Sequence, residues 1–116
     1  MKKLFLMSAL ATQFIALTPI AQAADNVSLR ICEYVAANDK SRLRSYLKQN
    51  KLRLRDVYSK ITCNGQNLLI FAASKNALEI GEFIIGKTPA KEVTDQIPEI
   101  AKYSKHLEEK AKERVK

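Results

Sequence analysis

Apolar side chains recur at helical spacing along most of this chain of 116 residues, and no segment alternates convincingly between apolar and polar positions. Leu43, Tyr46 and Leu47 fall on one face of a helix over residues 41–50, because a helical turn takes 3.6 residues. Comparable patterns predict helical segments over 28–37, 54–61, 67–75, 78–86, 88–98 and 99–116. The sequence therefore predicts an all-α fold.

Asparagine and glycine residues mark the ends of several segments. Asn64 and Gly65 give the strongest turn signal in the chain, and Asn67 is suited to cap the helix that follows. Gly86 predicts a left-handed end to the helix over 78–86, because glycine adopts that conformation without steric cost.

The N-terminal segment has the pattern of an export signal. Two lysines precede a mostly apolar run over residues 4–17, and Ala21 and Ala23 supply the small side chains that signal peptidase requires. We predict that residues 1–23 are a cleaved signal peptide. A membrane anchor is less favoured because a span needs about 20 apolar residues. The predicted location is the periplasm, with secretion as the alternative, and no transmembrane span is expected after cleavage.

An exported chain with one pair of cysteines, Cys32 and Cys63, is expected to form a disulfide, because oxidising compartments favour that state. In the chain-entropy model, closing this loop stabilises the fold by about 3–4 kcal/mol. A redox pair usually needs C-x-x-C spacing and a structural zinc site needs four close ligands, so both alternatives are less favoured.

A weak internal repeat relates two pairs of predicted helices. Residues 34–38 match residues 70–74 at an offset of 36. The second copy, residues 64–85, resembles an ankyrin repeat in its opening Asn-Gly, its Ala-Ala and its Glu-Ile before an apolar run. It departs from the ankyrin pattern at residues 67–70, where Asn-Leu-Leu-Ile replaces the usual Thr-Pro-Leu-His. The resemblance implies two ankyrin-like helix-turn-helix hairpins, followed by a C-terminal helix.

Several short stretches carry a second resemblance: Cys32 to Leu43, Leu54 to Tyr58, Cys63 to Gly65, Leu68 to Ala72 and Gly81 to Phe83. In these stretches the chain is similar to a family of small exported bacterial proteins classed as a domain of unknown function. The resemblance supports one folding unit with a cysteine pair, and it implies no activity.

The C-terminal part is predicted to form a helical, charged tail over residues 89–116, separate from a disulfide-stapled helical domain over residues 24–88. Thr88 and Pro89 predict a helix start, since Thr caps helices and Pro suits the first helical position. Pro98 is expected to end that helix. The last helix mixes both signs of charge, which is typical of a solvated tail, and docking to a partner is the alternative.

Positive charge is concentrated in one segment. The formal net charge is +8, and loss of the signal peptide, with its two lysines, would leave +6. Seven basic residues and no acidic residue lie between positions 40 and 55: Lys40, Arg42, Arg44, Lys48, Lys51, Arg53 and Arg55. Such a segment attracts phosphates, anionic lipid headgroups or an acidic partner. A solvated helix face is the alternative interpretation.

The residue inventory favours binding over catalysis. His106 is the only histidine, and no nucleophile motif or glycine-rich phosphate loop is present in the sequence. We therefore predict no enzymatic activity, no cofactor and no metal. We expect an exported protein-interaction module with an unidentified protein partner; the alternative is a binder of anionic envelope components, such as phosphorylated lipids, through the basic segment. Nucleic acid is less favoured because export removes access to the chromosome.

Overall fold

The computed structural model describes the backbone of residues 19–116 and the side chains of residues 26–116. Within this part of the chain there are seven α-helices and no strands, so the predicted all-α fold is confirmed. The helices are α1 (Pro19–Ala36), α2 (Lys40–Gln49), α3 (Leu54–Val57), α4 (Leu68–Ser74), α5 (Leu78–Lys87), α6 (Ala90–Tyr103) and α7 (Lys105–Val115). A short 3₁₀ turn, Tyr58–Lys60, follows α3.

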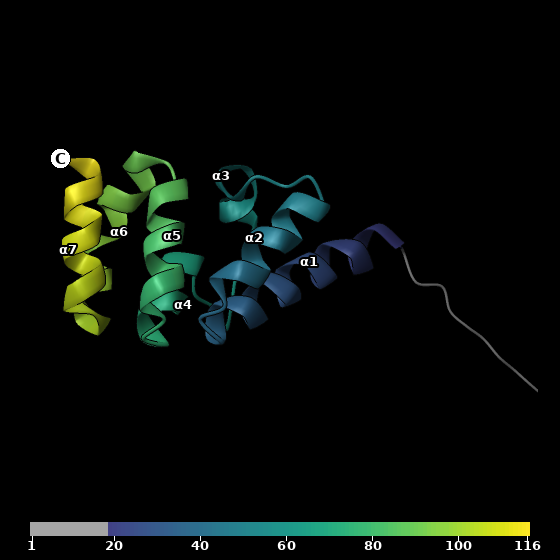
Figure 1. The fold of residues 1–116 in the computed structure, drawn as a ribbon, viewed down its shortest axis with the longest axis horizontal. Helices are drawn as coiled ribbons and strands as arrows, with labels where there is room; N and C mark the ends of the chain where they lie inside the picture. The colour runs from purple at the N-terminus through teal and green to yellow at the C-terminus, as the bar shows by residue number, and fades with distance from the viewer. Residues whose placement is uncertain (1–18) are drawn as a thin grey trace, which may run out of the picture.

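Six of these helices form three hairpins, α1 with α2, α4 with α5, and α6 with α7 (Figure 1). Helix α4 packs against both α1 and α6, while α5 packs against both α2 and α7. The hairpins therefore stack in a row, and each buries the apolar faces of its neighbours. The C-terminal segment forms the third hairpin of this row.

The turns of the first two hairpins are built alike. Asn38 and Asn76 both have a left-handed backbone, with φ of 55° and 56°. In each turn the Asn amide donates to the carbonyl three residues back, and the next amide donates five residues back. Equivalent turn residues are therefore 38 positions apart (76 − 38). The predicted offset of 36 is wrong for these turns. It came from aligning the two Ala-Ala pairs, whereas the turn conformation is determined by the left-handed asparagines. The finer resemblance to ankyrin repeats stays a prediction.

The third hairpin corrects the predicted boundary between the last two helices. Pro98 lies inside α6 and does not end it. Pro98 and Thr94 are exposed, so the Thr94 carbonyl that the proline leaves without a partner can be hydrated. The break comes instead at Ser104, whose backbone is extended at φ −152° and ψ 111°. The Ser104 hydroxyl accepts a hydrogen bond from the Leu107 amide at 3.1 Å and so caps α7.

The junction between α5 and α6 also differs from the prediction. Gly86 lies within α5, and its φ is not positive. Thr88 does not cap α6 with its side chain; its buried hydroxyl donates to the Ile84 carbonyl at 2.7 Å. Pro89 takes the capping position. Burial explains the change, because a hydroxyl removed from water needs an acceptor, and the last turn of α5 provides one.

Cys32 in α1 and Cys63 in the turn before α4 form the predicted disulfide, with their Cα atoms 5.8 Å apart. The adjoining turn is also confirmed. Cys63 and Gln66 exchange two backbone hydrogen bonds, of 2.8 and 2.9 Å, around Asn64 and Gly65, which both have positive φ. The Asn67 side chain then caps α4 by accepting from the Ile70 amide at 2.9 Å.

One apolar core runs through all three hairpins. Its fully buried side chains come from every long helix and include Ile31, Leu43, Ile80, Ile100 and Leu107. The predicted division between residues 24–88 and 89–116 falls between α5 and α6, and both parts contribute to this core.

The predicted signal peptide, residues 1–23, lies outside the described residues except for the backbone at the start of α1. Export therefore stays a prediction. No helix within residues 19–116 is long and apolar enough to cross a membrane.

Candidate functional site

An open groove of about 800 Å³ lies between the first hairpin, α3, the end of α5 and the end of α7. Six basic residues line it: Arg44, Lys48, Arg53, Arg55, Lys87 and Arg114. The rest of the lining is neutral and comprises Ser41, Ser45, Leu47, Leu52, Leu54, Phe83, Gly86 and Thr88. Among the residues that the structure describes, no acidic side chain lines this groove. We call it the basic groove.

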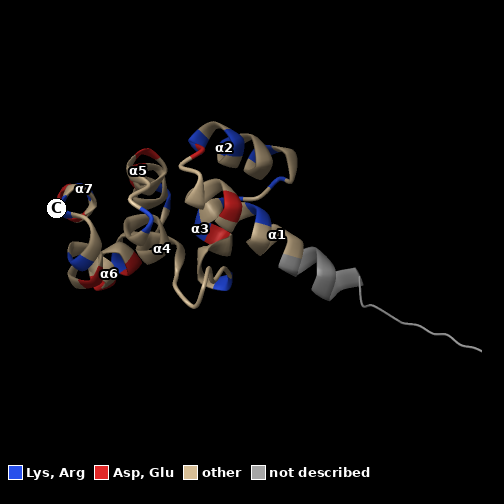
Figure 2. Ribbon diagram, turned by 90° about the horizontal axis from the view of Figure 1, so that it is seen from below, with Lys and Arg blue, Asp and Glu red and all other residues tan. Residues whose placement is uncertain are grey.

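Helix α2 supplies one wall of the basic groove. Arg44 and Lys48 are four residues apart, so they lie on the same side of the helix, next to the buried face formed by Leu43 and Leu47. Figure 2, in which basic residues are blue, shows basic positions along α2. Burial of the apolar face against the core fixes the helix rotation and thereby aims the two cations along the groove.

A left-handed turn after α2 brings the chain back to the groove. Lys51 has φ of 55°, and the next amide, that of Leu52, donates to the Leu47 carbonyl at 2.8 Å. This turn directs Arg53 and Arg55 to the second wall, where Leu54 is anchored in the core between them. Alternation of buried Leu54 with exposed arginines explains why both guanidinium groups stay outside the core.

The second and third hairpins complete the groove. Lys87 comes from the last turn of α5, and its Nζ lies 5.9 Å from the centre of the Phe83 ring. Arg114 comes from the end of α7, and its Nη2 donates to the Thr88 carbonyl at 3.2 Å. This hydrogen bond satisfies a carbonyl beyond the end of α5 and holds the Arg114 side chain at the groove.

The structure brings together four of the seven predicted binding residues: Arg44, Lys48, Arg53 and Arg55. The other three, Lys40, Arg42 and Lys51, do not line the groove. The Lys40 ammonium lies 3.6 Å from the Glu79 carboxylate, and Arg42 lies 3.4 Å from that of Asp39.

Lys87 and Arg114 join the groove although the linear charge run did not include them. Both are more than 30 positions beyond Arg55, and Arg114 belongs to a helix of mixed charge. Only the stacking of the third hairpin on α5 brings Arg114 to the groove. The sequence carries no local signal for that proximity.

Few of the groove cations are neutralised by neighbours. Arg53 pairs with Asp56 at 2.9 Å, with both side chains more than half exposed. Within the described residues, the other five groove cations form no ion pair. Gathering like charges around a hollow disfavours the empty state, and an anion in the groove would relieve the repulsion. The arrangement can therefore hold a ligand with several negative charges.

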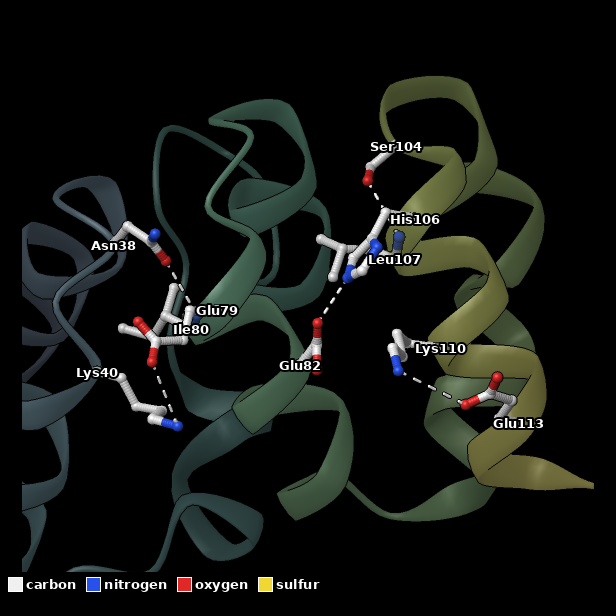
Figure 3. A network of polar contacts seen from close by, with 10 residues as sticks. All are labelled: Asn38, Lys40, Glu79, Ile80, Glu82, Ser104, His106, Leu107, Lys110 and Glu113. Atoms are coloured by element: carbon white, nitrogen blue, oxygen red, sulfur yellow. Dashed lines mark hydrogen bonds and ion pairs between the residues drawn. The ribbon is translucent and has the colours of Figure 1, made fainter.

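Polar contacts elsewhere join one hairpin to the next (Figure 3). The Ile80 amide at the start of α5 donates to the side-chain oxygen of Asn38 at 2.9 Å. Further along the row, His106 Nε2 lies 2.5 Å from the Glu82 carboxylate, and this hydrogen bond lowers the pKa of Glu82. His106 therefore has a partner that the sequence did not reveal. Both side chains are exposed, and neither lines the basic groove.

A second, smaller hollow of about 550 Å³ lies beside the 3₁₀ turn and α6. Its charged lining residues are Lys91, Glu92 and Asp95, and the Lys91 ammonium lies 3.6 Å from Asp95. The buried Tyr58 hydroxyl borders it without a hydrogen bond among the described residues, and burial together with nearby Glu92 raises the pKa of Tyr58. This hollow is lined by charges of both signs, which are partly paired. It therefore lacks the excess of positive charge that distinguishes the basic groove.

A family model described as "Protein of unknown function (DUF3718)" matches residues 31–94, which is more than half of the chain. The chain belongs to the DUF3718 family. This confirms the predicted membership of a family without assigned function. No curated protein and no solved structure gives a significant match.

The DUF3718 match spans the end of α1, all of α2 to α5 and the start of α6. Five of the six groove cations fall within it, and only Arg114 lies outside. Both disulfide cysteines also fall within the DUF3718 match. The match therefore contains the two walls built by α2 and α3 and the lining residues of α5, while the α7 side of the groove is formed by Arg114 alone, beyond the match.

Proposed function

We propose that this protein is an exported binding protein whose basic groove holds a ligand with several negative charges. One observation carries the proposal: six basic side chains from α2, the α3 segment, α5 and α7 surround one groove without an acidic lining residue among the described residues. Residues far apart in the sequence thus converge on one place, which a merely solvated helix face does not require.

The chemistry of the groove suits phosphate. Four of its cations are arginines, and the planar guanidinium group can bond two oxygens of one phosphate at once. A volume of about 800 Å³ is within the range of about 300–1,000 Å³ typical of small-molecule sites. The groove therefore suits a compact ligand with more than one anionic group.

The proposal combines export with a binding role, and separate observations support each part. The basic and apolar start of the chain is typical of a signal peptide, and a disulfide is compatible with an oxidising compartment. The exposed His106–Glu82 pair lies outside the groove, so it offers no positioned general base to a ligand held there. Binding without catalysis is the simplest role for this set of residues.

Calorimetric titration of the oxidised protein with tripolyphosphate tests the proposal. We expect micromolar affinity at low salt and a steep loss of affinity as salt is added, because the contacts are ionic. Substitution of two groove residues, Arg44→Gln with Arg55→Gln, should weaken binding by at least about tenfold.

The matched control is Arg30→Gln with Arg42→Gln, which removes the same charge from residues that pair with Glu33 and Asp39 outside the groove. This control should leave the affinity within about threefold of the wild-type value. Equal losses of affinity in the two double variants would show that only the net charge of the protein matters, and not the groove. Absence of binding by the wild-type protein would reject the proposal.

An acidic protein partner is the second candidate. The row of stacked hairpins favours it, because stacked helical repeats present extended surfaces to partners. Affinity capture from a periplasmic extract should then retain one protein that is lost with the Arg44 and Arg55 variant and kept with the Arg30 and Arg42 control. If neither the wild-type protein nor the control retains a partner, this candidate fails.

A further inference from the structure

We infer that the ligand of the basic groove is a phosphorylated lipid, whose headgroup phosphate meets the cations while its glycerol and first methylene groups cover the apolar floor. The inference rests on the proposed function and names the ligand class for the same site. Neutral side chains line the groove together with the cations, and a purely ionic ligand would leave their apolar surface exposed.

The floor of the groove is apolar. Leu47 and Leu54 are buried at its base, whereas Leu52 and Phe83 are only partly buried and remain open to the groove. A fully hydrophilic polyanion would leave Leu52 and Phe83 in contact with water. A ligand with a short hydrocarbon portion next to its phosphate would remove that apolar surface from water, which is favourable in proportion to the area covered.

The cations lie on different sides of this floor. Arg44 and Lys48 come from α2, Arg53 and Arg55 from the α3 segment, and Lys87 from the end of α5. A headgroup with its phosphate between these walls meets guanidinium or ammonium groups from more than one direction. The chain attached to it can leave through the open side of the groove, so the volume needs to hold only the headgroup and the nearest part of the lipid.

Charge complementarity selects anionic over neutral lipids. An anionic lipid surface attracts each basic residue near it with about 1 kcal/mol, and this attraction decays within a Debye length. The local excess of positive charge at the groove is not offset by any acidic lining residue among the described residues.

Co-sedimentation with vesicles tests the inference. The probes are vesicles of phosphatidylcholine with about one third phosphatidylglycerol, vesicles of phosphatidylcholine alone, and soluble tripolyphosphate as a phosphate without hydrocarbon. We expect tripolyphosphate to bind, and among the vesicles we expect binding to the anionic ones only. The Arg44→Gln and Arg55→Gln variant should lose at least about tenfold in affinity for the anionic vesicles.

A second variant separates the apolar contact from the charge. Leu52→Gln should weaken binding to the anionic vesicles by about three- to tenfold and leave the affinity for tripolyphosphate unchanged. Leu29→Gln is its matched control, because Leu29 is also an accessible leucine, 56% exposed, but lies on α1 outside the groove. Thermal unfolding of both variants verifies that they are folded.

The possible outcomes distinguish the two proposals. Tripolyphosphate binding without vesicle binding would overturn the lipid inference and leave the proposed function standing. Vesicle binding that is insensitive to Leu52→Gln, or equally sensitive to Leu29→Gln, would also overturn it, because the groove floor would then take no part. Absence of tripolyphosphate binding by the wild-type protein would reject the proposed function and, with it, the lipid inference.

Discussion

Individual residues with left-handed backbones determine how this chain turns. Three of the four non-glycine residues with positive φ in the described chain are asparagines, which tolerate this conformation better than other side chains. Asn38 has a second role, because its side chain accepts a hydrogen bond from the Ile80 amide in the next hairpin. The residue before α5, Ala77, has no side-chain oxygen with which to cap that helix, so a residue of another hairpin supplies the cap.

We predict that Asn38→Gly lowers the free energy of unfolding by about 0.5–1.5 kcal/mol, since glycine keeps the left-handed turn but loses the hydrogen bond to Ile80. Asn76→Gly is the control, because Asn76 has the same φ in the equivalent turn and its side chain makes no hydrogen bond within the described residues. Urea unfolding of the two variants gives the comparison. Equal effects would mean that the inter-hairpin hydrogen bond does not stabilise the fold.

Packing between α5 and α7 depends on the absence of a side chain at one position. A Cβ atom added at Gly81 would lie 2.7 Å from Leu107 Cδ1, and Leu107 is itself buried. The second glycine of α5, Gly86, has open space where its Cβ would be. A close approach therefore requires glycine at position 81 but not at position 86.

We predict that Gly81→Ala destabilises the fold by about 1–3 kcal/mol, because the added methyl group forces buried Leu107 to move. Gly86→Ala should have the opposite sign and stabilise by up to about 1 kcal/mol, since alanine has the higher helix propensity. In a Leu107→Ala background the cost of Gly81→Ala should disappear, which a double-mutant cycle by thermal unfolding measures. A persistent cost in that background would contradict the proposed contact.

Helices with a regular apolar face were predictable from the sequence, and their junctions were less so. The expected segments 41–50 and 78–86 correspond to α2 and α5 within one residue at each end. The predicted junction at Pro98 is misplaced, because the structure continues α6 through that proline and begins the next helix after Ser104, which the sequence prediction did not consider as a cap. A proline in an exposed position disrupts a helix less, and exposure depends on tertiary packing that no local pattern contains.

At the scale of the whole molecule, the disulfide joins the first hairpin to the segment that precedes the second. Other links between the first and second hairpins include the packing of α1 on α4, the contact of α2 with α5, and isolated polar bonds. A cross-link between residues 31 positions apart restricts the unfolded chain and therefore favours the assembled row.

We predict that reduction of the disulfide lowers stability by about 3–4 kcal/mol and the melting temperature by more than about 10 °C. Thermal unfolding with and without reductant measures this. The double variant Cys32→Ala with Cys63→Ala should be insensitive to reductant. Thiol labelling of both cysteines in exported, denatured and unreduced protein would refute the disulfide in the natural protein.

The candidate site was predictable only in part, because some of its residues come together only through tertiary packing. The charge run identified Arg44, Lys48, Arg53 and Arg55, because neighbours in sequence stay close in space. It could not separate them from Lys40, whose partner Glu79 arrives through the packing of the second hairpin. Arg114 was beyond reach, because its place at the groove depends on the packing of α7 against α5.

The position of Arg114 has a practical consequence. A fluorophore attached at Lys116 would begin two residues beyond a side chain that lines the groove. The chain has no tryptophan, so such a label would have little competing emission from the protein. Its brightness or anisotropy should change when a ligand draws Arg114 from the Thr88 carbonyl, which makes the C-terminus a reporter of groove occupancy. We expect an acidic affinity tag at the same end to compete with ligands for the groove.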